Sequence, residues 1–216
     1  IDFSVLEDCM REHLNEVAPR RMAVLDPVKL VIENYPEGKE EICEVPNHPQ
    51  KPEWGKRPVP FSRELWIERD DYQEAPQKGY FRLFPGNKVR LRYGYVIECI
   101  GYDKATDTVR CKYFEDSKSG TPGADSYKVK GNIHWGSAKH AHAAEVRLYD
   151  RLFKVEHPEG VEHLNSGSRN VIAAQLEPGL SDAVQDQIQF ERHGYFVRDN
   201  RGFNRTVTLR DSWKSG

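Results

Sequence analysis

Residues 89–97 read VRLRYGYVI, and this stretch decides the fold class. Apolar or aromatic residues occupy every second position from Val89 to Ile97, and Arg90 and Arg92 lie between them. A period of two is typical of a β-strand whose two faces meet different surroundings. The stretch therefore predicts a strand with both arginines on one face and aromatic side chains on the other.

Similar short runs continue on both sides of this stretch. They lie at 28–32, 61–67, 109–113, 129–135, 146–148, 171–172, 190–195 and 207–209. Turn signals rich in Pro and Gly separate them, at 85–86, 120–123, 158–160 and 200–202. About ten short strands with such punctuation predict barrels or sandwiches.

Helical spacing is confined to two places. Apolar residues recur at intervals of three and four between Leu6 and Leu14, and Pro19 ends that pattern at about Ala18. A second short helix is expected at 181–185, where Ser181 follows Pro-Gly and offers an N-cap. The 62–71 segment is ambiguous, but its aromatic and apolar content favours a strand.

Length and charge limit the possible functions. The chain has 216 residues, enough for one large domain or two small ones, and two small cores fit it better. Its 32 basic and 34 acidic residues give a net charge of −2, so it does not coat nucleic acid by bulk charge. Any nucleic-acid binding must use local positive charge, which orients a ligand. The chain begins in mid-pattern at Ile1, from which we expect a piece of a longer protein.

The cysteines indicate the compartment. Cys9, Cys43, Cys99 and Cys111 form no CxxC pair, so a zinc site is not expected. Cys99 and Cys111 lie in strand-like runs, which predicts buried thiols in a reducing, cytoplasmic setting. No apolar run approaches the roughly 20 residues of a membrane span, so no membrane association is expected.

Catalytic motifs do not stand out. The chain contains no GxxxxGK[ST], GxGxxG or HExxH pattern, so no catalytic residue is singled out and no cofactor is expected. His134, His140 and His142 are close enough in sequence to share a metal ion. We favour the simpler interpretation of surface histidines in a hairpin or loop, with no metal.

Cationic and aromatic residues occur together in several places. Arg82 follows Tyr80 and Phe81 in GYFRL, and Gln189 and Arg192 lie among aromatics in IQFERHGYF. Proteins that read RNA sequence stack unpaired bases on aromatic or guanidinium planes and hydrogen-bond their edges. The alternative is a solvated strand face on which each arginine pairs with a nearby acid.

Longer strings carry a family resemblance. They are VAPRRMAVLDPVKLVIENYP at 17–36, VPNHPQKPEWGKRPVPFSRELWIERDDY at 45–72, VRLRYGYVI at 89–97, VKGNIHW at 129–135, EVRLYDRLF at 145–153, QFERHGYF at 189–196 and FNRTVTLRDSW at 203–213. In this order they resemble the anticodon-binding region of glutaminyl-tRNA synthetases of the bacterial type, over nearly the whole chain.

The resemblance implies a fold and domain boundaries. It implies a mainly β chain with two antiparallel six-stranded β-barrels, the first interrupted by the second, after a short N-terminal helix. Residues 1–18 would be the tail of a helical subdomain. Residues 19–76 and 141–213 would form the proximal anticodon-binding barrel, and 77–140 the distal one.

The resemblance also implies site residues. Arg20, Gln189 and Arg192 match residues at the middle anticodon base, Arg82 matches the arginine at the third base, and Arg90 and Arg92 match the pair at the first. Supporting positions are Asn15, Gln50, Tyr80 and Phe81. The family's best-known bacterial pattern, QYKRL, is GYFRL here, so Gly79 and Phe81 replace polar and basic residues, and Phe81 is expected to stack. Gln50 stands where an asparagine is common.

A function follows from the resemblance. The HIGH-like and KMSKS-like motifs of class I synthetases do not occur in the chain. The chain itself would therefore be no enzyme, while its parent protein would ligate glutamine to tRNA using ATP and magnesium. Expected partners are the anticodon loop and stem of the glutamine tRNA and the catalytic domain of the same polypeptide, in a monomer. The alternatives are a stand-alone β-barrel module that binds RNA or protein without anticodon selectivity, and a metal-dependent hydrolase using the histidine cluster.

Overall fold

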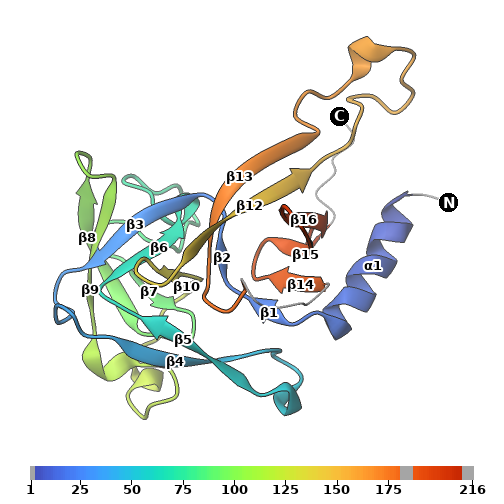
Figure 1. The fold of residues 1–216 in the computed structure, drawn as a ribbon. Helices are drawn as coiled ribbons and strands as arrows, with labels where there is room; N and C mark the ends of the chain where they lie inside the picture. Colours follow the sequence, from blue (N-terminus) through green and yellow to red (C-terminus); the bar gives the residue numbers. More distant parts are fainter. Residues whose placement is uncertain (1–2, 181–186, 211–216) are drawn as a thin grey trace. The chain divides into compact units, whose positions relative to one another are not determined.

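The computed structural model describes residues 3–180 and 187–210, and it is mainly β with a helix at its start (Figure 1). This confirms the predicted fold class. The chain divides into two compact units. Unit 1 comprises 1–21, 144–173 and 184–216, and unit 2 comprises 22–143 and 174–183. The expected barrel boundaries at 76/77 and 140/141 stay a prediction.

The elements of unit 1 come from three stretches of the chain. They are α1 (Phe3–Val17), β1 (Arg20–Arg21), β12 (His142–Tyr149), the 3₁₀ helix η5 (Val161–His163), β13 (Arg169–Leu176), β14 (Gln187–Phe190), β15 (Gly194–Asp199) and β16 (Gly202–Val207). The first residues of β12 and the last residues of β13 belong to unit 2.

Helix α1 confirms the N-terminal helix of the sequence analysis. Its buried residue, Leu14, packs with Ala18, Tyr195 and Val207, and Met10 lies against this cluster. Pro19 follows directly, and a proline restricts the residue before it to extended backbone. The helix therefore ends where the sequence predicts, and β1 begins at once.

The strands of unit 1 pair in the order β1-β14-β15-β16-β12-β13. Two hairpins join β14 to β15 and β15 to β16, both antiparallel. Phe190 packs its ring against Phe196 and Phe203, with ring centroids 4.4 and 5.3 Å apart. These aromatic contacts give unit 1 its core.

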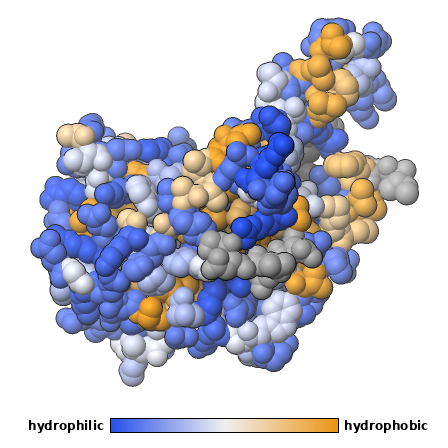
Figure 2. Space-filling model, in the orientation of Figure 1, coloured by the Kyte–Doolittle hydropathy of each residue, from blue (hydrophilic) through white to orange (hydrophobic). Residues whose placement is uncertain are grey.

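A long connection joins β12 to β13 (Figure 1). Its apolar side chains are unusually exposed: Leu152 at 57%, Val155 at 43% and Val161 at 80%. Figure 2 shows the corresponding hydrophobic surface gathered on this connection. A β-bridge between Phe153 and Leu164 closes its base.

Unit 2 holds the remaining strands. They are β2 (Ala23–Val24), β3 (Pro27–Ile32), β4 (Glu41–Pro46), β5 (Lys56–Phe61), β6 (Glu64–Glu68), β7 (Lys88–Leu91), β8 (Val96–Asp103), β9 (Thr108–Tyr113), β10 (Gly131–Ile133) and β11 (Gly136–Ser137). Four 3₁₀ helices connect them: η1 (Pro52–Trp54), η2 (Arg69–Asp71), η3 (Glu115–Ser117) and η4 (Ala124–Ser126). One sheet runs β10-β7-β8-β9-β3-β6-β11, β4 pairs with β5, and β2 pairs with the end of β13.

The core of unit 2 is aromatic at its centre. Phe61 contacts Tyr35, Tyr95 and Trp135, with ring centroids 5.1 to 5.3 Å apart. Branched aliphatic residues of β3, β6 and β7 surround this group, all buried. Edge-to-face aromatic packing adds to the burial of large apolar surfaces, so this cluster anchors the sheet.

The strand number and direction differ from the expectation. Within the described residues, each large sheet has seven strands where six were expected, the first counting β2 beside the end of β13. In the same residues four strand pairs are parallel: β1 with β14, β7 with β10, β12 with β16, and β3 with β9. Hairpins force antiparallel pairing only between neighbours in sequence. Strands that meet after a long excursion are free of that constraint, and short bridging strands add to the number.

The 89–97 stretch is also not one strand. Strand β7 ends at Leu91 and β8 begins at Val96, because Tyr93 takes a left-handed φ of 59° in a tight turn. The amides of Leu91 and Gly94 close this turn by bonding Tyr95 O and Leu91 O at 2.9 and 2.8 Å. The predicted shared strand face for Arg90 and Arg92 is therefore wrong, since Arg92 lies in the turn. The turn was not evident from the sequence because apolar and polar residues keep alternating in both strands of the hairpin.

Other expectations meet mixed outcomes. The 62–71 segment does contain a strand, β6, but a bend at Arg63 separates it from β5 and the 3₁₀ helix η2 follows it. Cys99 and Cys111 are buried, as predicted, and Cys43 is buried too. The structure also makes Cys99 and Cys111 register partners in the β8–β9 pair. The helix expected at 181–185 lies outside the described residues. Within the described ranges, no helix combines the length and apolar character that crossing a membrane requires.

Candidate functional site

Strand β1 places Arg20 at the end of α1. Its guanidinium donates to Ala18 O at 2.7 Å, to Asn15 O at 3.1 Å and to Asn15 Oδ1 at 2.7 Å. The last carbonyls of a helix have no partner within the helix, so a cation there is favourable. Only 6% of Arg20 is exposed. Arg20 and Asn15, both predicted site residues, therefore form one buried arrangement.

Strand β14 brings Gln189 opposite Arg20. The two residues are register partners in the parallel β1–β14 pair, and Gln189 N donates to Pro19 O at 2.9 Å. Paired residues of neighbouring strands share a sheet face. Arg192 follows in the β14–β15 turn with a left-handed φ of 73°. The structure thus gathers in unit 1 the residues expected at the middle base, although Arg20 and Gln189 lie at opposite ends of the sequence.

Arg82 is held by a buried carboxylate. Its NH1 lies 3.1 Å from Asp71 Oδ1, and Asp71 is fully buried while the Arg82 side chain is 42% exposed. NH1 also donates to Asp70 O at 3.3 Å, and the Tyr80 hydroxyl donates to the same carbonyl at 3.0 Å. An ion pair of this kind orients a guanidinium that still reaches solvent.

Phe81 borders a pocket of about 320 Å³ in unit 2. Its ring is 51% exposed, and Lys130 Nζ lies 4.7 Å from the ring centroid. The other lining residues are Gly86, Asn87, Lys88, Lys128 and Val129. The three lysines were not among the residues predicted from the sequence. The alternation Lys-Val-Lys at 128–130 is the signal that would have drawn attention to them, because a strand-like alternation puts both lysines on one side.

The guanidinium of Arg90 is hydrogen-bonded to backbone carbonyls. Its NH1 donates to Ser117 O and its NH2 to Ala124 O, both at 2.8 Å. Arg90 therefore fastens the 114–126 segment to β7. Arg92 lies in the β7–β8 turn, with its guanidinium carbon 5.7 Å from the ring centroid of Tyr93. Its own carbonyl accepts from Trp135 Nε1 at 2.9 Å.

Two further predicted positions lie in loops. Gln50 is exposed between β4 and β5, where its backbone N–H donates to His48 Nδ1 at 3.2 Å. Gly79 has a φ of 91° and open space where a side chain would begin, so it serves the turn that leads into Tyr80 and Phe81. A positive φ of this size favours glycine over the polar residue of the family's usual pattern.

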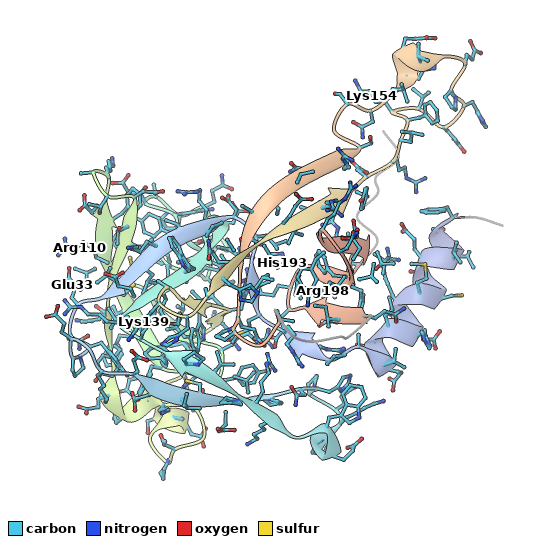
Figure 3. All side chains as sticks on the ribbon, viewed as in Figure 1. Glu33, Arg110, Lys139, Lys154, His193 and Arg198 are labelled. Atoms are coloured by element: carbon cyan, nitrogen blue, oxygen red, sulfur yellow. The ribbon has the colours of Figure 1, made fainter. Side chains whose placement is uncertain are left out.

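Arg82 differs from an ordinary surface arginine. Arg110 on β9 pairs with Glu33 at the surface, with both side chains roughly half exposed (Figure 3). Such an exposed pair is screened by solvent and contributes little. The partner of Arg82 is fully buried. The sequence left two interpretations open for its arginines. Arg110 is the solvated ion pair, and Arg82 is the cation that a buried carboxylate orients.

The histidines do not all lie on the surface as expected. His134 is fully buried, and its Nε2 lies 3.2 Å from Glu68 Oε1. The Glu68 carboxylate also accepts from the amides of Leu25 and Asp26, at 2.7 and 3.0 Å. The surface interpretation is therefore wrong for His134, because a buried carboxylate satisfies its ring nitrogen. His140 is half-buried and pairs with Glu40 at 2.7 Å.

A second carboxylate network sits near the aromatic core of unit 2. The hydroxyls of Tyr35 and Tyr95 donate to Glu41 Oε2 at 2.7 and 2.8 Å. Burial raises the pKa of Glu41, but these hydrogen bonds and the charges of Lys118 and Lys39 outweigh it and hold that pKa at about 2. Glu41 is therefore ionised at neutral pH and ties β4 to the rings.

Comparison with known families gives two matches of the same description. Residues 18–114 and residues 132–199 each match a family model described as class I tRNA synthetases (E and Q), anticodon-binding domain. The first match covers Arg20, Arg82, Arg90 and Arg92. The second covers Gln189 and Arg192.

Similar proteins extend this finding. A glutamine–tRNA ligase of Cupriavidus metallidurans is 59% identical over 99% of the chain. Ligases of the same name from Ralstonia nicotianae and Bordetella pertussis are 56% and 53% identical over 99% and 100% of it. The chain spans only 40%, 40% and 39% of these relatives.

Proposed function

Because the chain belongs to the anticodon-binding domains of the class I tRNA synthetases for glutamate and glutamine, we propose that it recognises the anticodon of a glutamine tRNA. The family makes tRNA its partner. The glutamine identity rests on the ligases named above, each of which matches essentially the whole chain.

One observation carries the proposal. The β1–β14 pair sets Arg20 opposite Gln189, and the Asn15 side chain fixes the guanidinium of Arg20. A glutamine amide offers one donor and one acceptor, and an arginine offers several donors in a plane. Together they suit the edge of an unpaired pyrimidine, as RNA readers of single-stranded loops require.

Arg82 would add a second contact in unit 2. Asp71 orients its guanidinium, and the Arg82 side chain remains 42% exposed. The guanidinium could therefore donate hydrogen bonds to a base or a phosphate. A bidentate base contact discriminates by roughly 1–3 kcal/mol. Two or three such contacts would give several kcal/mol of preference, less the free energy of unstacking the loop.

The chemistry would belong to the rest of a longer protein. We propose that such a protein is a glutamine–tRNA ligase that consumes ATP with magnesium, acting as a cytoplasmic monomer. In that protein the chain would supply discrimination and would make no covalent bond itself.

Two variants test base reading. Gln189→Ala and Arg82→Ala should each weaken binding to the glutamine tRNA by about tenfold, which corresponds to about 1.4 kcal/mol. A tRNA altered at the middle anticodon base should lose little further affinity from Gln189→Ala, because that base no longer fits the glutamine amide. Affinities are measured by fluorescence anisotropy of labelled transcripts.

Matched controls come from the same chain. Gln187→Ala removes an exposed glutamine two residues away on β14, and Arg110→Ala removes an arginine from a surface ion pair. Both should bind like the wild type. If the wild-type chain binds the glutamine tRNA and the altered tRNA equally, the proposal fails and a module without anticodon selectivity is favoured.

A further inference from the structure

The pocket beside Phe81 is cationic on one wall and aromatic on another. Lys88, Lys128 and Lys130 line it together with the ring of Phe81. Its volume of about 320 Å³ lies in the range of small-molecule sites. These groups suit a ligand that combines a planar ring with a separate negatively charged group.

The charge in the pocket is poorly neutralised. Lys88 Nζ lies 3.7 Å from Glu98 Oε2, a long ion pair, and 4.5 Å from the ring centroid of Phe114. Within the part of the chain that the structure describes, Lys128 and Lys130 form no ion pair with a carboxylate. Both are exposed. Three lysines therefore line the pocket, and Glu98, the carboxylate paired with Lys88, is shared with Lys112 at 3.3 Å.

The aromatic wall of the pocket, the Phe81 ring, is accessible to a ligand. Phe81 is 51% exposed, although it is a large apolar side chain in a unit whose central phenylalanine, Phe61, is fully buried. Lys130 Nζ over its ring adds a cation–π contact that holds the lysine at the pocket. Bases of any sequence stack on such a ring.

The pocket is connected to Arg82 by its backbone. Asn87 Nδ2 donates to Arg82 O at 2.6 Å, and Asn87 lines the pocket. On the other side, a Cβ at Gly131 would meet Phe81 O at 2.3 Å, so only glycine lets β10 approach this closely. The pocket and the candidate base contact of Arg82 therefore adjoin each other within unit 2.

We propose that this pocket binds the nucleotide on the 3′ side of the one contacted by Arg82, with its base stacked on Phe81 and its phosphate on Lys128 and Lys130. The inference rests on the proposed function and extends it by one nucleotide beyond the anticodon. Stacking is tolerant of sequence, so the pocket contributes affinity and register, while Arg82 contributes identity.

The lysines are tested by salt dependence. Lys128→Gln/Lys130→Gln should make the negative slope of log affinity against log salt concentration less steep, by about 0.7 for each phosphate that is no longer neutralised. The control, Lys29→Gln/Lys104→Gln, removes the same charge from two lysines of unit 2 that pair with Glu64 and Glu74. It should keep the wild-type slope. Lys128→Arg/Lys130→Arg should keep it as well.

The ring is tested separately. Phe81→Leu should bind the glutamine tRNA about tenfold more weakly, while Phe81→Tyr should bind like the wild type. A 2-aminopurine placed in turn at each base of the anticodon loop reports stacking by quenching. One position should be quenched by the wild type and by Phe81→Tyr but not by Phe81→Leu.

The outcomes separate this inference from the proposed function. A wild-type chain without anticodon preference contradicts the proposed function. If that preference is present, but the two lysine pairs change the salt slope equally or Phe81→Leu binds like the wild type, the pocket assignment is wrong and the proposed function stands.

Discussion

At the scale of single residues, two buried carboxylates of unit 2 are each held by an arginine. The Glu177 carboxylate is 1% exposed and accepts from Met22 N at 2.9 Å and from Arg57 at 2.5 and 2.8 Å. Asp71 is buried against Arg82 in the same way. A buried carboxylate without such donors would be strongly destabilising. For Arg82, pairing and base contact are therefore compatible, because the partner orients the guanidinium.

Glu41 gives a pH dependence at this scale. Its pKa of about 2 in the folded chain lies below the value of about 4.3 for an unfolded glutamate. A lowered pKa stabilises the fold fully above the unfolded value, and the stabilisation is lost as pH falls through the folded value. Glu41→Gln should therefore lower the free energy of unfolding by about 1 kcal/mol at pH 7. Its deficit should shrink between about pH 4 and pH 2.

The measurement is urea unfolding followed by tryptophan fluorescence at a series of pH values. Glu44→Gln, at an exposed position of the same strand, is the matched control and should unfold like the wild type. A deficit for Glu41→Gln that stays constant down to pH 2 would show that its charge is irrelevant.

At the scale of elements, local pattern predicts where strands occur but not where they turn. The alternation in 89–97 correctly indicated strand, and α1 ended at the predicted proline. The turn at Tyr93 was missed because its residues continue the alternation, and only Gly94 marks it. The same limit applies to the candidate site. Motifs selected Arg82 and Gln189, whereas the burial of Arg20 and the lysines around Phe81 depend on chain segments that meet only in the fold.

Strand β10 offers a stability prediction. Gly131→Ala places a Cβ 2.3 Å from Phe81 O and 2.7 Å from Val89 Cγ1, so the strand or its neighbours must move. Overpacking of this kind destabilises by about 1–3 kcal/mol. Chemical unfolding measures it.

The control for this variant lies in the same sheet. Gly101→Ala, on β8, adds a Cβ with no atom within 4 Å and should change stability by less than about 0.5 kcal/mol. Equal effects of the two substitutions would mean that the close approach of β10 to Phe81 does not matter.

At the scale of the whole molecule, the length of the chain favoured two small cores, and the structure has two compact units. Strand order was beyond the sequence, because Lys29 of β3 meets Thr108 of β9 across a long stretch of intervening chain. No periodicity encodes such a pairing. The family resemblance supplied the antiparallel expectation, and the parallel pairs are its main departure.

The net charge gives a prediction at this scale. A chain with net charge −2 repels a polyanion unless local cations make the contacts. Its binding to whole tRNA should therefore weaken steeply with salt, with a slope of about −2 if three phosphates are contacted. Anisotropy between about 50 and 300 mM KCl measures this slope. Affinity that is independent of salt would exclude phosphate contacts as its source.

The position of Arg20 has a consequence for helix α1. Its guanidinium occupies the carbonyls of Asn15 and Ala18, while its backbone lies in register with Gln189. A base that drew on the same N–H groups would loosen the last helical turn. By reciprocity, fraying of that turn would change affinity for the base by the same factor. Hydrogen exchange of the amides near the end of α1 would then become faster when an anticodon is bound.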